Sequence, residues 1–168
     1  MSTLKVGTIQ DHANSITAMT IDNAGRVLTP ARPAFKASVG GNFGSRTTTD
    51  TIQITPYNDA QLNIGNCYNT SNYTFTAPVA GNYFFSISQN KYGKLIVYLY
   101  KNSTAFHAGE FLLDSSPNWE HCTISAVIPL AVNDTVTARC KLTNNSGTQY
   151  AWNGNSQSWD SFSGYLIG

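Results

Sequence analysis

Charged side chains are scarce in this chain of 168 residues, where Asp, Glu, Lys and Arg together make up 11%. An ordinary soluble domain has about 25%. The exposed faces of helices are usually rich in Glu, Lys and Arg, so this shortage disfavours a helical fold. The formal net charge is +1 and no basic run occurs, which leaves little to attract a nucleic acid electrostatically.

Cysteines and long apolar runs are also few. The three cysteines, Cys67, Cys122 and Cys140, form no Cys-x-x-Cys pair, which argues against a disulfide framework and against zinc. No apolar run reaches the length of a membrane span, and the opening MSTLKVGTIQDH has no apolar signal-peptide core. We therefore expect a complete chain that starts at Met1, is made in a cytoplasm and does not insert into a membrane.

Reactive side chains are not grouped in a way that supports catalysis. Glu120-His121-Cys122 is the only tight cluster. Neighbouring residues on a strand point to opposite faces, which opposes a cysteine–histidine pair. His12, His107 and His121 are too scattered for a metal triad. We expect no enzymatic activity, no cofactor and no metal centre, and the sequence leaves open whether a loop binds calcium.

Alternating apolar residues dominate the chain from residue 34 onward and predict an all-β domain over residues 34–168. In the clearest case, Val136, Ala138, Cys140 and Leu142 share one face of a strand and polar residues share the other, so Cys140 is expected to be buried. We expect a turn at 56–59 and a jelly-roll sandwich of about eight to ten antiparallel strands. The expected strands centre on residues 35–39, 52–54, 73–75, 83–87, 95–100, 124–130, 136–142 and 159–167.

Residues 1–33 have a different pattern and are expected to form a short β-rich arm. LKVGTIQ is typical of a short strand, and SITAMTID-NAG-RVLTP is typical of a small hairpin. Such short strands cannot bury a core alone and need a partner. We predict that the arm anchors the chain to other proteins. The anchoring residues are expected to be Leu4, Val6, Ile9, Met19, Ile21 and Val27.

Two expected strands are apolar on both faces: 95–100, and the strand in which Phe84 lies opposite Tyr83 and Phe85. A strand in a two-layer sandwich needs only one apolar face. The second face is covered either by another chain or by a loop of the same chain. We expect Tyr83 and Phe85 to fill the core. The contacts between copies of the chain are predicted to be Phe84, Tyr98, Tyr100 and Tyr165.

Aromatic residues in the polar loop before the last strand offer a second kind of surface. Tyr150 and Trp152 lie among Asn, Ser and Gly, and Trp119 lies in a similar setting. Rigid rings in such surroundings suit contact with a glycan or receptor. The alternative is that Trp152 packs its loop against the domain and that Trp159 begins the last strand in the core.

Several ordered motifs from Ala34 to Gly168 resemble one known family. They include Asn-x-Gly-x-x-Tyr, a central Phe-x-Ala-Pro-x-x-Gly-x-Tyr-x-Phe, Leu-x-x-x-Asp-x-Val and a closing Phe-Ser-Gly-x-Leu. Together they resemble the globular head of the first complement component, a jelly roll shared in outline with tumour necrosis factor. The matching residues are Ala34, Phe35, Lys36, Ala37, Asn63, Gly65, Tyr68, Phe75, Ala77, Pro78, Gly81, Tyr83, Phe85, Leu99, Asn102, Leu130, Asp134, Val136, Phe162, Ser163, Gly164 and Leu166.

This resemblance implies a jelly roll that forms tight trimers and binds through loops or grooves without catalysis. Members of the family usually follow a collagen stem, and this chain has no Gly-x-y repeat. Its first 33 residues instead resemble the opening of bacteriophage virion proteins, especially tail-fibre-like proteins. We therefore expect a homotrimeric head of a fibre or fibre tip, located in the virion and meeting the host surface, with a host-surface glycan as a candidate partner. The alternatives are a capsid decoration protein and a soluble lectin-like or signalling module.

Overall fold

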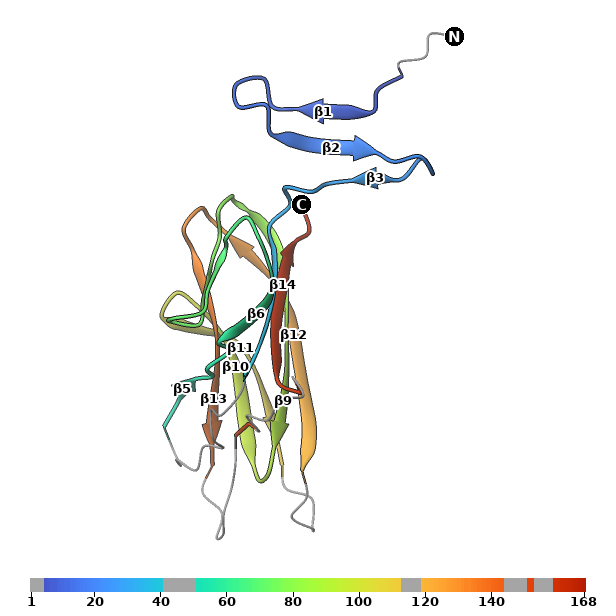
Figure 1. Cartoon of the computed structure of the whole chain (residues 1–168). Coiled ribbons are helices and arrows are strands. Elements are labelled where there is room, and N and C mark those ends of the chain that lie inside the picture. Colours follow the sequence, from blue (N-terminus) through green and yellow to red (C-terminus); the bar gives the residue numbers. More distant parts are fainter. Residues whose placement is uncertain (1–4, 41–50, 113–118, 144–150, 153–158) are drawn as a thin grey trace.

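The computed structural model describes residues 5–40, 51–112, 119–143, 151–152 and 159–168, and in these residues it contains strands and no helix. Figure 1 shows a sandwich of long strands and a small separate sheet beyond one end of it. All strand pairs are antiparallel. The prediction of an all-β jelly roll is confirmed, with eleven strands, β4 to β14, in the described part of the sandwich.

The two sheets of the sandwich are named here after their long central strands. The β9 sheet has the order β12 (Glu120–Leu130), β9 (Gly81–Lys91), β14 (Ser161–Leu166), β4 (Ala34–Ser38) and β6 (Asp59–Ile64). The β10 sheet has the order β11 (Thr104–Phe111), β10 (Leu95–Lys101), β13 (Thr135–Leu142), β8 (Thr74–Thr76) and β7 (Tyr68–Asn69), and β5 (Gln53–Ile54) also pairs with β13. Strands β6 and β7 are therefore edge strands of different sheets.

Aromatic rings fill the space between the sheets. Phe35 lies at the centre of this core, stacked on Tyr68 with ring centroids 4.6 Å apart and set edge-on to Phe162 at 4.8 Å. Tyr83 and Phe85 are completely buried, as predicted, and so is the apolar face of β10. Complete burial of one large apolar side chain stabilises a fold by about 1.5–3 kcal/mol, so this cluster accounts for much of the stability of the sandwich.

Gly164 shows why the closing Phe-Ser-Gly motif contains glycine. A β-carbon at this position would lie 2.5 Å from Cδ1 of Phe85 and 2.9 Å from Cε1 of Phe35. The core rings therefore pack directly over the backbone of β14. Any side chain at position 164 would push these rings out of place.

The structure differs from the sequence prediction in three edge strands and one side chain. The turn expected at 56–59 ends where β6 begins at Asp59, and β6, β7 and β11 were not expected as strands. Because β11 is an edge strand whose residues are mostly exposed, its sequence lacks the alternation that marks the other strands. Trp159 precedes β14 and is 43% exposed, so the expectation that it lies in the core is wrong.

The N-terminal arm forms a three-stranded sheet of its own, made of β1 (Thr8–Gln10), β2 (Thr17–Ile21) and β3 (Val27–Leu28). The expected turn between β2 and β3 is present, with Gly25 at a φ of 78° and Asp22 accepting backbone hydrogen bonds from Ala24 and Arg26. Figure 1 shows this sheet near the C-terminus of the chain. The backbone N–H of Leu166 donates to the carbonyl of Pro33 at 3.0 Å, which fixes the start of the sandwich beside its last strand.

Candidate binding surfaces and a polar cleft

Three apolar side chains form a patch across the outer face of the β9 sheet. Phe84 on β9 lies opposite Tyr165 on β14 and Val127 on β12, and the rings of Phe84 and Tyr165 are 5.5 Å apart. Tyr165 is 48% exposed and Val127 is 50% exposed, while Phe84 is half-buried. We call these three residues the Phe84 patch.

On one side of the Phe84 patch the neighbouring residues are small and polar. One step along the same three strands lie Ser86, Ser125 and Ser163, which also point away from the core. Small side chains of this kind do not cover the patch. An uncovered apolar patch that spans three rigid strands is typical of a surface that packs against another protein.

Tyr98 and Tyr100 lie on the outer face of the other sheet. Their rings are 5.9 Å apart, and the guanidinium of Arg139 lies 4.1 Å from the ring centre of Tyr100. The pKa of the Tyr98 hydroxyl is raised, mainly because the group is partly buried. The four predicted trimer contacts are thus separated into two pairs on opposite sides of the sandwich. Because Arg139 covers Tyr100 from within the chain, the second apolar face of β10 does not require a partner there.

Four of the six predicted anchor residues lie on one face of the arm sheet. Ile9 lies opposite Met19, and Ile21 lies opposite Val27. Alternation along β2 then places all four side chains on the same side. Ile9, Ile21 and Val27 are 45–58% exposed and Met19 is half-buried. We call these four residues the arm face.

The two remaining anchor predictions have other outcomes. Val6 precedes β1 and is half-buried. Leu4 lies outside the described residues. Neither residue adds to the arm face as the structure describes it.

The aromatic residues predicted to contact a glycan do not form one surface. Trp119 is 40% exposed and lies against Tyr92, with ring centroids 5.7 Å apart. Trp152 is only 3% exposed, so its ring has almost no surface to offer a ligand. The structure favours the alternative that Trp152 packs its segment against the domain. Tyr150 lies outside the described residues.

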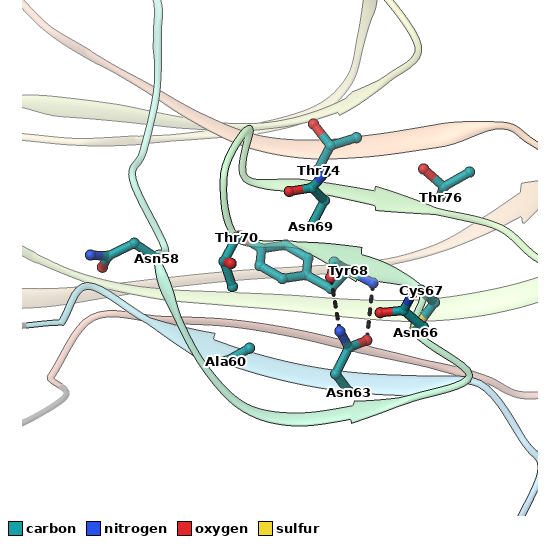
Figure 2. A pocket seen from close by; sticks show the side chains of 10 residues that line it. All are labelled: Asn58, Ala60, Asn63, Asn66, Cys67, Tyr68, Asn69, Thr70, Thr74 and Thr76. Carbon is teal, nitrogen blue, oxygen red and sulfur yellow. Dashed lines mark hydrogen bonds between the residues drawn. The ribbon is translucent and has the colours of Figure 1, made fainter.

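A cleft of about 720 Å³ opens where the edges of the two sheets meet, and we call it the seam cleft. Figure 2 shows its lining, which comes from β6 and the residue before it, the turn between β6 and β7, β7 and the residue after it, and β8. The lining side chains are uncharged, and seven of the ten are asparagine or threonine. The lining residues are Asn58, Ala60, Asn63, Asn66, Cys67, Tyr68, Asn69, Thr70, Thr74 and Thr76.

Asn63 joins two strands of the seam cleft lining. Its Nδ2 donates to the carbonyl of Tyr68 at 2.8 Å and its Oδ1 accepts from the backbone N–H of Tyr68 at 3.0 Å, as the dashed lines in Figure 2 mark. A side-chain amide thus takes the place of a backbone pairing between β6 and β7. Gly65 provides the positive φ of 78° that the intervening turn needs. These contacts explain the Asn-x-Gly-x-x-Tyr motif.

The buried groups around the seam cleft are chemically inert at neutral pH. Burial raises the pKa of the Cys67 thiol to about 11 and also raises the pKa of the Tyr68 hydroxyl. That hydroxyl donates to the carbonyl of Tyr57 at 2.8 Å. Neither group is ionised near pH 7, so the cleft provides neutral hydrogen-bonding groups and no nucleophile.

The predicted separation of His121 and Cys122 is present in the structure. His121 is exposed, whereas Cys122 is 3% exposed and its Sγ lies 3.2 Å from the carbonyl oxygen of Gln89. Burial raises the pKa of the Cys122 thiol to about 12. Among the described residues no three His, Cys, Asp or Glu side chains are grouped so as to hold a metal ion. The described chain also has no helix with the length and apolar character needed to cross a membrane.

Sequence reasoning missed the seam cleft because its wall comes from several segments that were not recognised as strands. A signal was present: asparagine occurs at positions 58, 63, 66, 69 and 72. Asparagine suits turns and tolerates left-handed backbone, as Asn66 does at a φ of 47°. This density therefore indicated turns without indicating a shared cavity.

Comparisons with known proteins agree with this architecture. A model of the C1q domain family matches residues 34–167. Among solved structures, the globular domain of a zebrafish complement 1qA protein is similar, with a TM-score of 0.63, 20% sequence identity, and coverage of 82% of this chain and 98% of that chain. At this identity the likeness concerns the fold alone. No curated protein sequence matches the chain.

The predicted resemblance of residues 34–168 to a complement head is therefore confirmed. C1q domains are non-enzymatic binding modules that typically form homotrimers. The family model begins at residue 34, and the resemblance of residues 1–33 to phage proteins stays a prediction.

Proposed function

This chain belongs to the C1q domain family, and on that premise we propose that it acts as a homotrimeric, non-enzymatic head whose N-terminal arm anchors it in a bacteriophage virion. The main support for a trimer is the Phe84 patch on the outer face of the β9 sheet, which no described residue covers. In a closed trimer each subunit presents the same surface toward the threefold axis. Packing three such patches together removes the apolar side chains from water.

The Phe84 patch is proposed as the contact in preference to the Tyr98–Tyr100 pair. Tyr165 and Val127 are about half exposed, and nothing in the described part of the chain covers them. Tyr100 instead packs against Arg139 of its own chain. An apolar surface that is already partly covered gains less from association than one that is open to water.

The arm face supports the anchoring part of the proposal. A two- or three-stranded sheet without a core is marginal in water unless one of its faces packs on something else. The arm face presents Ile9, Ile21 and Val27 in an exposed row, on a sheet that lies beyond the end of the sandwich. We assign another virion protein as its partner, because residues 1–33 resemble the opening of virion proteins.

Labelling the chain in purified particles tests the virion role. The proposal expects labels at the fibre or its tip, with a few tens of copies per particle. Hundreds of copies spread over the shell would instead identify a capsid decoration protein. Absence from purified particles would contradict the virion role. The remaining alternative would then be a soluble binding module, which the seam cleft supports because it could hold a ligand.

A further inference from the structure

We propose that the seam cleft binds a neutral saccharide. This assignment deepens the proposed function, because it names a ligand class and a site for a head that is otherwise only a binding module. It places the ligand at the edge of the sandwich between β6 and β7, in a lining that includes neither Trp119 nor Trp152.

The size and charge of the seam cleft restrict its ligand. A volume of about 720 Å³ lies within the range of roughly 300–1,000 Å³ that is typical of small-molecule sites. None of the ten lining side chains is a Lys, Arg, His, Asp or Glu. A phosphate, a carboxylate or a metal ion would find no charged partner in this lining, whereas an uncharged ligand rich in hydroxyl groups would.

Two asparagine side chains on the rim are fixed in orientation. The Oδ1 of Asn58 accepts from the backbone N–H of Gly40 at 2.8 Å, and the Oδ1 of Asn69 accepts from the backbone N–H of Ser71 at 2.8 Å. Each bond identifies the oxygen of the amide and so fixes the direction of its Nδ2 group. Neither Nδ2 has an acceptor among the described residues. These are donors held in place before any ligand arrives.

Three further side chains of the lining complete the hydrogen-bonding capacity. Asn66, Thr70 and Thr76 make no side-chain hydrogen bond to another described residue. Their hydroxyl and amide groups both donate and accept. A sugar hydroxyl also does both, so it can accept from a fixed amide and donate to a threonine oxygen at the same time.

The frame around these groups is rigid, which lowers the entropic cost of binding. Asn63 ties β6 to β7 through two hydrogen bonds, and the Tyr68 side chain is anchored in the core by its bond to Tyr57. Tyr68 itself is only 3% exposed. A ligand in this cleft would therefore meet polar groups that are already in position.

Two sets of variants of the full chain test the assignment without disturbing the frame. The double variant Asn58→Asp/Asn69→Asp keeps both acceptor oxygens for Gly40 and Ser71 but removes both Nδ2 donors. Thr76→Val removes one hydroxyl and keeps a β-branched side chain on β8. The matched controls are Asn23→Asp in the arm hairpin and Thr104→Val at the start of β11, both at exposed positions away from the cleft.

Binding is measured by saturation-transfer NMR and calorimetry with neutral methyl glycosides of hexoses and N-acetylhexosamines, and with sialic acid as a charged comparison. We expect millimolar or tighter binding of at least one neutral glycoside, weakened about tenfold or more by either cleft variant and unchanged by the controls. Failure of the whole neutral panel at millimolar concentration overturns the assignment. Equal binding by the cleft variants, or binding of sialic acid alone, also overturns it.

Light scattering on the same samples separates this assignment from the proposed function. A trimer that binds no neutral glycoside contradicts the seam cleft as a saccharide site and leaves the trimeric head intact. A monomer that binds a glycoside through the cleft contradicts the trimer and leaves the site intact. The two proposals therefore fail in different measurements.

Discussion

Phe84 is a half-buried aromatic residue between two completely buried ones. Its neighbours Tyr83 and Phe85 are completely buried, while its own ring lies against Tyr165 on the outer face of the β9 sheet. The sequence predicted this division for Tyr83 and Phe85 from alternation, and the structure confirms that both fill the core. The role of Phe84 in a trimer depends on the other copies.

Phe84→Asp should separate the trimer and leave each head folded. The substitution removes no core side chain, but it would place an unpaired carboxylate from each subunit in the proposed interface, which costs about 3–5 kcal/mol per buried charge. We expect a monomer by light scattering with an unchanged circular dichroism spectrum. Tyr98→Asp, on the opposite sheet, is the matched control and should remain trimeric. If Tyr98→Asp were monomeric and Phe84→Asp trimeric, the trimer contact would instead lie on the outer face of the β10 sheet.

Gly164→Ala should destabilise the head, because its new methyl group would meet the ring of Phe85 at 2.5 Å. Forcing an extra methyl group into a packed core costs about 1–3 kcal/mol. Urea unfolding measures this loss. Ser163→Ala, one residue earlier and pointing away from the core, should change the free energy of unfolding by less than about 0.5 kcal/mol. Equal stability of the two variants would show that the core rings can move aside.

Asp134 should make the stability of the head sensitive to acid. Its carboxylate accepts hydrogen bonds from Asn102 Nδ2 and the backbone N–H of Ala131 and pairs with Lys101, and these contacts lower its pKa from 3.8 to about 2. A pKa lowered by folding gives a stabilisation that is present above about pH 4 and lost as the pH falls toward 2. We expect Asp134→Asn to be less stable than the wild type at pH 7, with the difference shrinking in acid. A constant difference from pH 7 to 2 would contradict this role.

At the level of strands and sheets, alternation predicted the elements that have one buried face and an apolar sequence. Strands β9, β10, β12 and β13 are of this kind. Strand β11 was missed because an edge strand needs few apolar residues, and β6 was missed because the residues before it read as a turn. An edge strand is defined mainly by the backbone hydrogen bonds to its one neighbouring strand. A single sequence does not show which strands are neighbours, so edge strands are hard to predict from it.

The arm face offers a test at the level of one sheet. Ile21→Asp should prevent incorporation of the chain into particles, because it places a charge in the apolar row formed with Ile9, Met19 and Val27. Thr20→Asp is the matched control, since Thr20 is the preceding residue of β2 and points to the other face. Incorporation is measured by immunoblotting purified particles. Light scattering should show that both variants remain trimeric.

Two outcomes would contradict this account of the arm. Normal incorporation of Ile21→Asp would show that the arm face does not bind a virion protein. Loss of the trimer in Ile21→Asp, with Thr20→Asp still trimeric, would show that the arm faces of three copies pack on one another. In the second case the partner of the arm is the chain itself.

At the level of the whole molecule, the candidate sites were less predictable than the fold. The sequence identified Phe84 and Tyr98 as outward-facing aromatic residues but could not show that they lie on opposite sheets. The seam cleft was not predicted at all, because it exists only where the edges β6 and β7 come together. Trp152 was ambiguous for a related reason, since its burial depends on packing against the rest of the domain.

We propose that the functional unit is a trimer assembled through the outer face of the β9 sheet. The mass of the purified full-length chain in solution, measured by light scattering coupled to size exclusion at micromolar concentration, tests this assembly. We expect a single species of about three times the 18.2 kDa mass of one chain. A folded monomer of 18.2 kDa under these conditions would contradict it.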